Sequence, residues 1–268
     1  MKLRLDKLGV VVALLAVYAA FFAPLMIFRP NRRKSLWESL PPSTSIAFVV
    51  VIGVAILITL FKTPLYLRLS AAAAVLAGLA ISVGSAASFL TPDGNTYARV
   101  SPASGAWLLM LAFALLAADA IARLRPTPVV RIAFLAVSVA GIALVLSSGL
   151  WDGLSIIREY AGRADVFWQE AGKHVTLAIG SLIAAVVVGL PLGVLAHRVT
   201  SLRSGILNTL NFVQTIPSIA LFGILIAPLG WIAINVPGAA AIGIRGIGAA
   251  PAFVALFLYS LLPVVANT

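Results

Sequence analysis

Apolar residues form long, continuous windows along the chain, and short groups of charged residues separate one window from the next. Each window approaches the roughly 20 residues that a helix needs to cross the hydrocarbon core of a bilayer. A membrane barrel would instead alternate apolar and polar residues at every second position. The pattern therefore predicts about eight transmembrane helices, at 8–28, 45–61, 69–90, 106–121, 132–150, 175–196, 207–232 and 251–265.

Composition supports this interpretation, because 62% of the residues are hydrophobic and only 10% are charged. Soluble domains are roughly 45–50% apolar and about 25% charged. The first window is also longer than the apolar part of a signal peptide, which is about 7–15 residues. We expect an all-α, polytopic integral membrane bundle, with 8–28 retained as its first helix. The Gly- and Ala-rich stretch 236–250, which carries Arg245, is expected to be a loop or a short re-entrant piece.

The formal net charge is +11, from 19 Lys and Arg against 8 Asp and Glu. In a soluble protein this excess would suggest nucleic-acid binding. Here the basic residues lie between apolar windows, where they hold loops at the membrane surface. We therefore expect contact with membrane lipid and no nucleic-acid partner. The short basic loops 123–131 and 197–203 favour a cytoplasmic N-terminus.

The residue types needed for common catalytic or metal sites are absent or far apart. There is no cysteine, and His174 and His197 lie at opposite ends of one apolar window. A helix of that length separates them by about 30 Å, so they cannot share a metal ion. No catalytic set can be assembled, and we expect neither an enzyme nor a metal or cofactor site in this chain.

The chain changes in character near residue 151, which predicts three parts. Residues 1–150 contain five apolar helices with few polar side chains. Residues 151–173 carry apolar side chains at helical spacing, among them Ile157, Tyr160, Phe167 and Trp168, opposite charged ones such as Arg158. They predict an amphipathic interfacial helix, or alternatively a solvated linker helix. Residues 174–268 form the third part.

The third part contains a charge-free run, 204–244, that is about twice as long as one spanning helix. Its first half carries polar residues in an apolar context, and Asn208, Asn211 and Thr215 share one helical face with Gln214 beside it. Such groups either line a translocation path or hold helices together by hydrogen bonds, and both alternatives stay open. Upstream, Gly189, Pro191 and Gly193 predict a kinked helix with a small-residue face for helix packing.

Asp119 is the acidic residue that falls inside an apolar window. Arg123 follows four residues later, so a local ion pair is the plain interpretation. An ion-coupling or proton-relay role is the alternative, as for any acid within the membrane.

Three motifs of the third part resemble those of a known family. They are Gly-Leu-Pro-Leu-Gly at 189–193, Val-Gln-Thr-Ile-Pro-Ser at 213–218 and Tyr-Ser-Leu-Leu-Pro at 259–263. Together they resemble the permease subunit of binding-protein-dependent ABC importers, in the osmoprotectant branch that carries glycine betaine, choline or related quaternary amines. The additional helices before them resemble the longer YehY-type permease of that branch.

The resemblance implies a multi-pass subunit of the bacterial cytoplasmic (inner) membrane with residues 174–268 as permease core. It implies a second permease subunit, cytosolic ABC ATPase subunits that bind the ATP, and a periplasmic or extracellular solute-binding protein, with no cofactor in this chain. It places the following residues on the translocation path: Gln214, Thr215, Pro217, Ser218, Tyr259, Ser260 and Pro263. The shared helical face adds Asn208 and Asn211 to this path.

One departure from the family pattern is the absence of the cytoplasmic E-A-A…G loop that docks into the ATPase. The chain is therefore expected to be truncated at its C-terminal side and unable to couple to ATP hydrolysis as it stands. Two other functions are kept as alternatives: an ion-coupled secondary transporter or channel, and a membrane remnant that transports nothing.

Overall fold

The computed structural model describes residues 4–28, 32–91 and 98–268. The chain divides into two compact units, Met1–Gly162 and Arg163–Thr268. Within the described residues, seven helices are long and apolar enough, by length and composition, to cross a membrane. The prediction of an all-α polytopic bundle with about eight membrane helices is confirmed.

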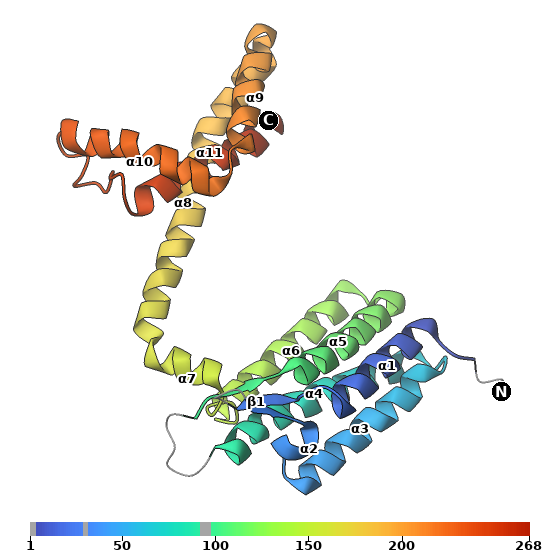
Figure 1. Ribbon diagram of the computed structural model, residues 1–268. Helices are drawn as coiled ribbons and strands as arrows, with labels where there is room; N and C mark the ends of the chain where they lie inside the picture. The colour runs from blue at the N-terminus through green and yellow to red at the C-terminus, as the bar shows by residue number, and fades with distance from the viewer. Residues whose placement is uncertain (1–3, 29–31, 92–97) are drawn as a thin grey trace. The chain divides into compact units, whose positions relative to one another are not determined.

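The first unit is built on four helices that pack against one another. They are α1 (Lys7–Phe21), α3 (Pro42–Leu60), α4 (Leu65–Leu90) and α5 (Ser104–Leu124). Figure 1 shows them side by side, with the short α2 (Leu36–Ser39) at one end. Two further helices complete the unit, α6 (Pro128–Ser147), which has no buried residue, and α7 (Ser155–Gly162).

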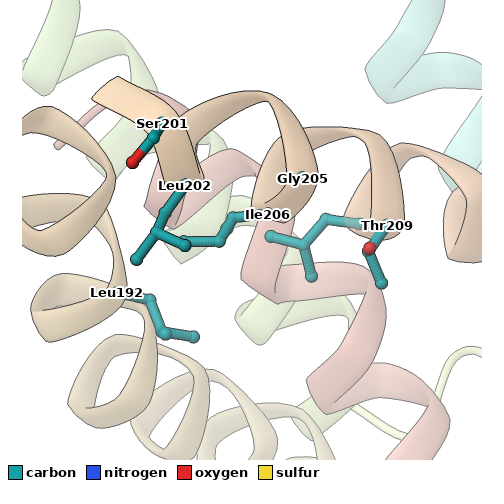
Figure 2. A pocket seen from close by; sticks show the side chains of 7 residues that line it. Leu192, Ser201, Leu202, Gly205, Ile206 and Thr209 are labelled. Carbon is teal, nitrogen blue, oxygen red and sulfur yellow. The ribbon is translucent and has the colours of Figure 1, made fainter. Parts of the chain in front are cut away.

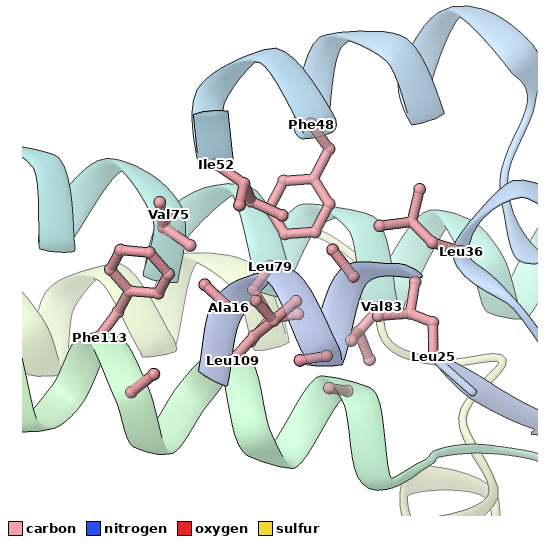
Figure 3. Packing of buried hydrophobic residues seen from close by; sticks show 14 of the residues in the cluster. Ala16, Leu25, Leu36, Phe48, Ile52, Val75, Leu79, Val83, Leu109 and Phe113 are labelled. Carbon is pink, nitrogen blue, oxygen red and sulfur yellow. The ribbon is translucent and has the colours of Figure 1, made fainter. Parts of the chain in front are cut away.

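Alanines and large side chains alternate in the core of this unit. Ala16 of α1 is fully buried and lies among Phe48, Val75, Leu109 and Phe113 from the other three helices (Figure 3). Because a small residue lets the neighbouring backbones approach, bulky side chains from the facing helices can fill the remaining space. This explains why the alanine-rich windows fold as a compact bundle.

A small antiparallel sheet follows α1, with strand order β2-β1-β3. It consists of β1 (Met26–Phe28), β2 (Arg32–Lys34) and β3 (Val100–Pro102). The prediction of one helix over 8–28 is therefore wrong beyond Phe21. Pro24 cannot donate to a helical carbonyl, and the next N–H, of Leu25, bonds to the carbonyl of Lys34 in β2. The remaining α1 is 15 residues long, or about 22 Å.

The second unit contains the helices α8 (Ala164–Arg198), α9 (Thr200–Thr215), α10 (Ser218–Asn235) and α11 (Ala249–Ala266). The single amphipathic helix predicted within 151–173 is wrong, because α7 ends at Gly162 and α8 begins at Ala164. Arg163 has a non-helical backbone there, and glycine is among the weakest helix formers. The three-part division of the chain stays a prediction.

The helix predicted over 207–232 is also wrong, because two helices, α9 and α10, occupy that window. They are separated by the extended Ile216 and by Pro217, which caps α10. Proline disfavours helical geometry in the residue before it, so the break falls where the sequence places Pro217. The stretch 236–250, predicted to be a loop or a short re-entrant piece, has no helix between Asn235, where α10 ends, and Ala249, where α11 begins.

Candidate functional site

Helices α8 and α11 pack closely through the small residues of α8. Gly189 and Gly193 are both buried. A Cβ atom built on Gly189 would lie 2.7 Å from Cγ1 of Val264, and one built on Gly193 would lie 2.5 Å from Cβ of Thr268. Both positions therefore require the absence of a side chain for this approach. Pro191 lies between them, and α8 continues through it to Arg198.

Helix α9 packs on α11 through a small apolar cluster. Leu210 of α9 is buried together with Leu261 and Val265 of α11 and Ala185 of α8. Gln214 lies one turn after Leu210, so it is presented to the same neighbour. The apolar contact thus fixes which polar side chain of α9 meets α11.

A pair of hydrogen bonds joins the end of α9 to α11. The Gln214 Nε2 amide donates to the backbone carbonyl of Tyr259 at 2.9 Å. The Tyr259 hydroxyl donates in return to the backbone carbonyl of Ile216. We call Gln214, Ile216, Pro217 and Tyr259 the polar break, because they bring hydrogen-bonding groups together where the apolar helix is interrupted.

The interruption at Pro217 leaves backbone carbonyls that a continuous helix would have satisfied. The carbonyl of Phe212 accepts from the Thr215 hydroxyl at 2.7 Å. The carbonyl of Val213 accepts from the Ile216 N–H at 3.2 Å. Neighbouring hydrogen-bond donors of the chain and the Tyr259 hydroxyl thus satisfy the carbonyls around the break. Helix α10 begins at Ser218.

The other predicted path residues take no part in the hydrogen bonds that join α9 to α11 within the described part of the chain. Asn208 and Asn211 are exposed on α9, as are Thr215 and, at the start of α10, Ser218. On α11, Ser260 is half-buried, and Pro263 is exposed. The structure therefore brings Gln214 and Tyr259 together and leaves Asn208, Asn211 and Thr215 as an exposed polar stripe on α9.

Sequence reasoning missed an open groove of about 430 Å³ between α8 and α9. Figure 2 shows Leu192 of α8 facing Leu202 and Ile206 of α9, with Ser201, Gly205 and Thr209 along the same helix. The spacing of the last three, four residues apart, marks one helical face of small residues. That spacing was the available signal. None of the predicted path residues lines this groove.

The remaining candidates fall outside this arrangement. Asp119 accepts from Nε of Arg123 at 2.9 Å, so the predicted local ion pair is confirmed. His174 and His197 both lie on α8. No group of three or more His, Cys, Asp or Glu residues is placed to hold a metal ion within the described residues.

The helices described above make this chain a multi-pass α-helical membrane protein. Residues 6–157 match the family described as ABC transporter permease YehY, N-terminal domain. Because this match covers more than half of the chain, the protein belongs to that family.

Several curated relatives are permease proteins. The chain is 46% identical over 94 residues to the osmoprotectant import permease protein OsmW of Salmonella typhimurium, which covers 35% of this chain and 37% of the relative. It is 34% identical over 96 residues to the choline transport system permease protein OpuBB of Bacillus subtilis, covering 36% and 37%. It is 30% identical over 109 residues to the glycine betaine/carnitine/choline transport system permease protein OpuCD of Bacillus subtilis, covering 41% of each. The chain thus spans about two fifths of the length of these relatives, and no solved structure matches it.

Proposed function

We propose that the protein is a permease subunit of an ABC importer that moves an osmoprotectant, such as glycine betaine or a related quaternary amine, across the bacterial inner membrane. The observation that carries the proposal is the similarity to permease proteins whose names specify osmoprotectant, choline and glycine betaine transport. The family of residues 6–157 agrees with this class.

The polar break is the part of the chain that would shape the translocation path. Hydrogen-bonding side chains within a membrane are costly unless they are paired or face water. Gln214 and Tyr259 are paired, whereas Asn208, Asn211 and Thr215 are exposed on α9, where the Thr215 hydroxyl donates within the helix. These exposed groups would face the solute path, and the pair would hold α9 and α11 at its edge.

The proposed transport requires partners, as the match to an ABC transporter permease family and to permease proteins of transport systems indicates. Cytosolic ATPase subunits would bind the ATP and drive the cycle. A solute-binding protein outside the membrane would deliver the solute, and a second permease subunit would complete the path.

Uptake of radiolabelled glycine betaine tests the proposal. Because residues 1–268 by themselves are expected not to couple to ATP hydrolysis, the protein is extended by the family's cytoplasmic docking loop. It is produced with its ATPase and binding protein in cells that lack other uptake systems for this solute. We expect ATP-dependent uptake, and Gln214→Ala should lower the initial rate about tenfold because a membrane-embedded hydrogen bond is lost. Asn235→Ala is the matched control, because its amide donates locally to Trp231 on α10. Absence of uptake with every partner present would refute the proposal.

A further inference from the structure

A pocket of about 430 Å³ opens at the end of the first unit where α1 and α4 begin and where α3 and α5 end. Its charged lining residues are Asp6, Lys7, Lys62, Arg68 and Arg123. Four cationic side chains thus surround one carboxylate. Basic residues are expected at the ends of membrane helices, but here they converge on one pocket, which points to an anionic occupant.

Arg68 is the buried element of this pocket, with a side chain that is 2% exposed. Its Nη2 donates to Oδ1 of Asp6 at 2.8 Å. Its Nε is buried and has no hydrogen-bond partner among the described residues. An unpaired guanidinium N–H in a buried position is costly, so this donor calls for an acceptor that enters the pocket.

Two lysines at the pocket have no ion-pair partner among the described residues. Asp6 pairs with Arg68, and Asp119 pairs with Arg123 at 2.9 Å. Within the described parts of the chain, no carboxylate lies at ion-pair distance from the exposed Lys7 or Lys62. An anion would therefore meet two free ammonium groups and the unpaired Nε of Arg68.

Two of these cations occupy positions that a helix by itself disfavours. Lys7 is the first residue of α1, and Arg68 is the fourth residue of α4. Both lie in the first turn, where the helix dipole repels positive charge and attracts anions. Asp6 offsets this cost for α1 by accepting from the Gly9 N–H at 2.9 Å. An anion in the pocket would offset it for both helices.

The pocket is held in shape by backbone contacts. The Asp6 N–H donates to the Leu60 carbonyl, and the Lys62 N–H donates to the Arg4 carbonyl, each at 3.0 Å. A Cβ atom on Gly9 would lie 1.8 Å from the carbonyl oxygen of Thr59, so α1 and α3 meet there without space for a side chain. The backbone that carries the cationic side chains is thus held in place by contacts within the protein.

We propose that this pocket binds a phosphate group, and that the group belongs to the head of an anionic phospholipid. Phosphate oxygens accept several charge-assisted hydrogen bonds, which suits the Arg68 Nε and the two lysines. The pocket lies at the end of apolar membrane helices, where lysine stems lie along the hydrocarbon while their ammonium groups reach the headgroups. Basic pockets between membrane helices bind anionic headgroups in this way.

Native mass spectrometry of the full chain in detergent tests the proposal with phosphatidylglycerol as the probe. The wild-type protein should retain this lipid in preference to phosphatidylcholine. The double variant Lys7→Gln/Lys62→Gln should bind it on the order of tenfold more weakly or worse, because two cations near the anionic group are lost. The matched control is Arg32→Gln/Arg33→Gln, which removes two exposed cations from β2, at the other end of α1.

The outcomes separate the two possible sources of the phosphate group. Loss of phosphatidylglycerol in the lysine variant, with retention in the arginine control, supports the lipid site. Equal retention in both variants overturns the proposal. A second titration uses inorganic phosphate: if it binds the wild type but not the lysine variant while no lipid is retained, the pocket binds phosphate and the assignment to a lipid is overturned. Both substituted lysines are exposed, so the variants should keep their fold.

Discussion

The side chain of Gln214 and the backbone of Tyr259 are joined by a 2.9 Å hydrogen bond across 45 residues of sequence. The Tyr259 hydroxyl in turn donates to the carbonyl of Ile216, directly before Pro217. One amide and one phenol thus tie the end of α9 and the interruption before α10 to α11. Any movement of α11 would carry this interruption with it.

Removal of the Tyr259 hydroxyl should loosen this link. Tyr259→Phe keeps the ring but leaves the Ile216 carbonyl without its donor, so we expect the free energy of unfolding to fall by about 1 kcal/mol. Thermal unfolding of the purified protein in detergent measures the change. Tyr66→Phe is the control, because the side chain of Tyr66 is 64% exposed. An equal effect of both variants would contradict the assigned role of Tyr259.

Close packing of α8 on α11 predicts that substitution by alanine changes stability very differently at two glycines of α8. Gly189→Ala places a methyl group 2.7 Å from Cγ1 of Val264, whereas nothing lies within 4 Å of a Cβ on Gly172. Gly189→Ala should destabilise the protein by about 1–3 kcal/mol, as overpacked sites do. Gly172→Ala should be neutral or stabilising, since alanine favours the helix. Loss of stability in the second variant only would contradict the packing described here.

The Asp6–Arg68 pair predicts how stability depends on acid pH. Burial of Asp6 disfavours its charge, but hydrogen bonds from Arg68 and from the Gly9 N–H outweigh burial and hold the pKa of this carboxyl below its ordinary value. As the pH falls, Asp6 is therefore protonated in the unfolded chain before it is protonated in the folded protein. The stabilisation is complete above about pH 4 and is lost as the pH falls through the lower folded pKa.

Asp6→Asn isolates this effect, because the asparagine oxygen can still cap the helix and accept a hydrogen bond from Arg68 but carries no charge to form the ion pair. The variant should lose about 3 kcal/mol at neutral pH, since a buried charge is left unpaired. Its loss of stability between about pH 4 and pH 2 should also be shallower than that of the wild type. Unfolding midpoints measured across this pH range check both points, and parallel curves for the two proteins would refute them.

Asp119 distinguishes the proposed importer from an ion-coupled carrier. Its Oδ1 pairs with Arg123, while its Oδ2 is buried without a hydrogen-bond partner among the described residues. Asp119→Asn should leave the ATP-driven uptake rate within about twofold of the wild type, because the energy of an ABC importer comes from its ATPase. Abolished uptake in a stable variant would favour the ion-coupled alternative instead.

Hydropathy alone identified most of the membrane helices, because a spanning helix needs a long apolar window and little else. Hydropathy failed to predict the structure where an apolar segment forms a strand and not part of a helix. Residues Met26–Phe28 are as apolar as the helix before them, yet they form β1 once Pro24 ends the helical hydrogen bonding. The pairing partners of that strand lie on β2 and β3, and a local window cannot reveal them.

The candidate site shows the same division between local and distant information. The stripe of polar residues on α9 follows from helical spacing, as does the small-residue face of α8. The sequence does not show that Gln214, which lies beside this stripe, meets Tyr259. That contact depends on tertiary packing, because Leu210 and Leu261 fix the rotation of α9. Asp6 and Arg68, 62 residues apart, were missed for the same reason.

Water accessibility of the polar stripe on α9 is the most direct test of the proposed solute path. The chain has no cysteine, so single thiols can be introduced without a background, and a thiol reacts with polar reagents only where water lets it ionise. Asn211→Cys should react with a membrane-impermeant thiol reagent at least about tenfold faster than Ile224→Cys, an exposed apolar position on α10. Reaction at Asn211→Cys that is as slow as at Ile224→Cys would show that this face meets lipid or protein, and it would contradict the proposed path.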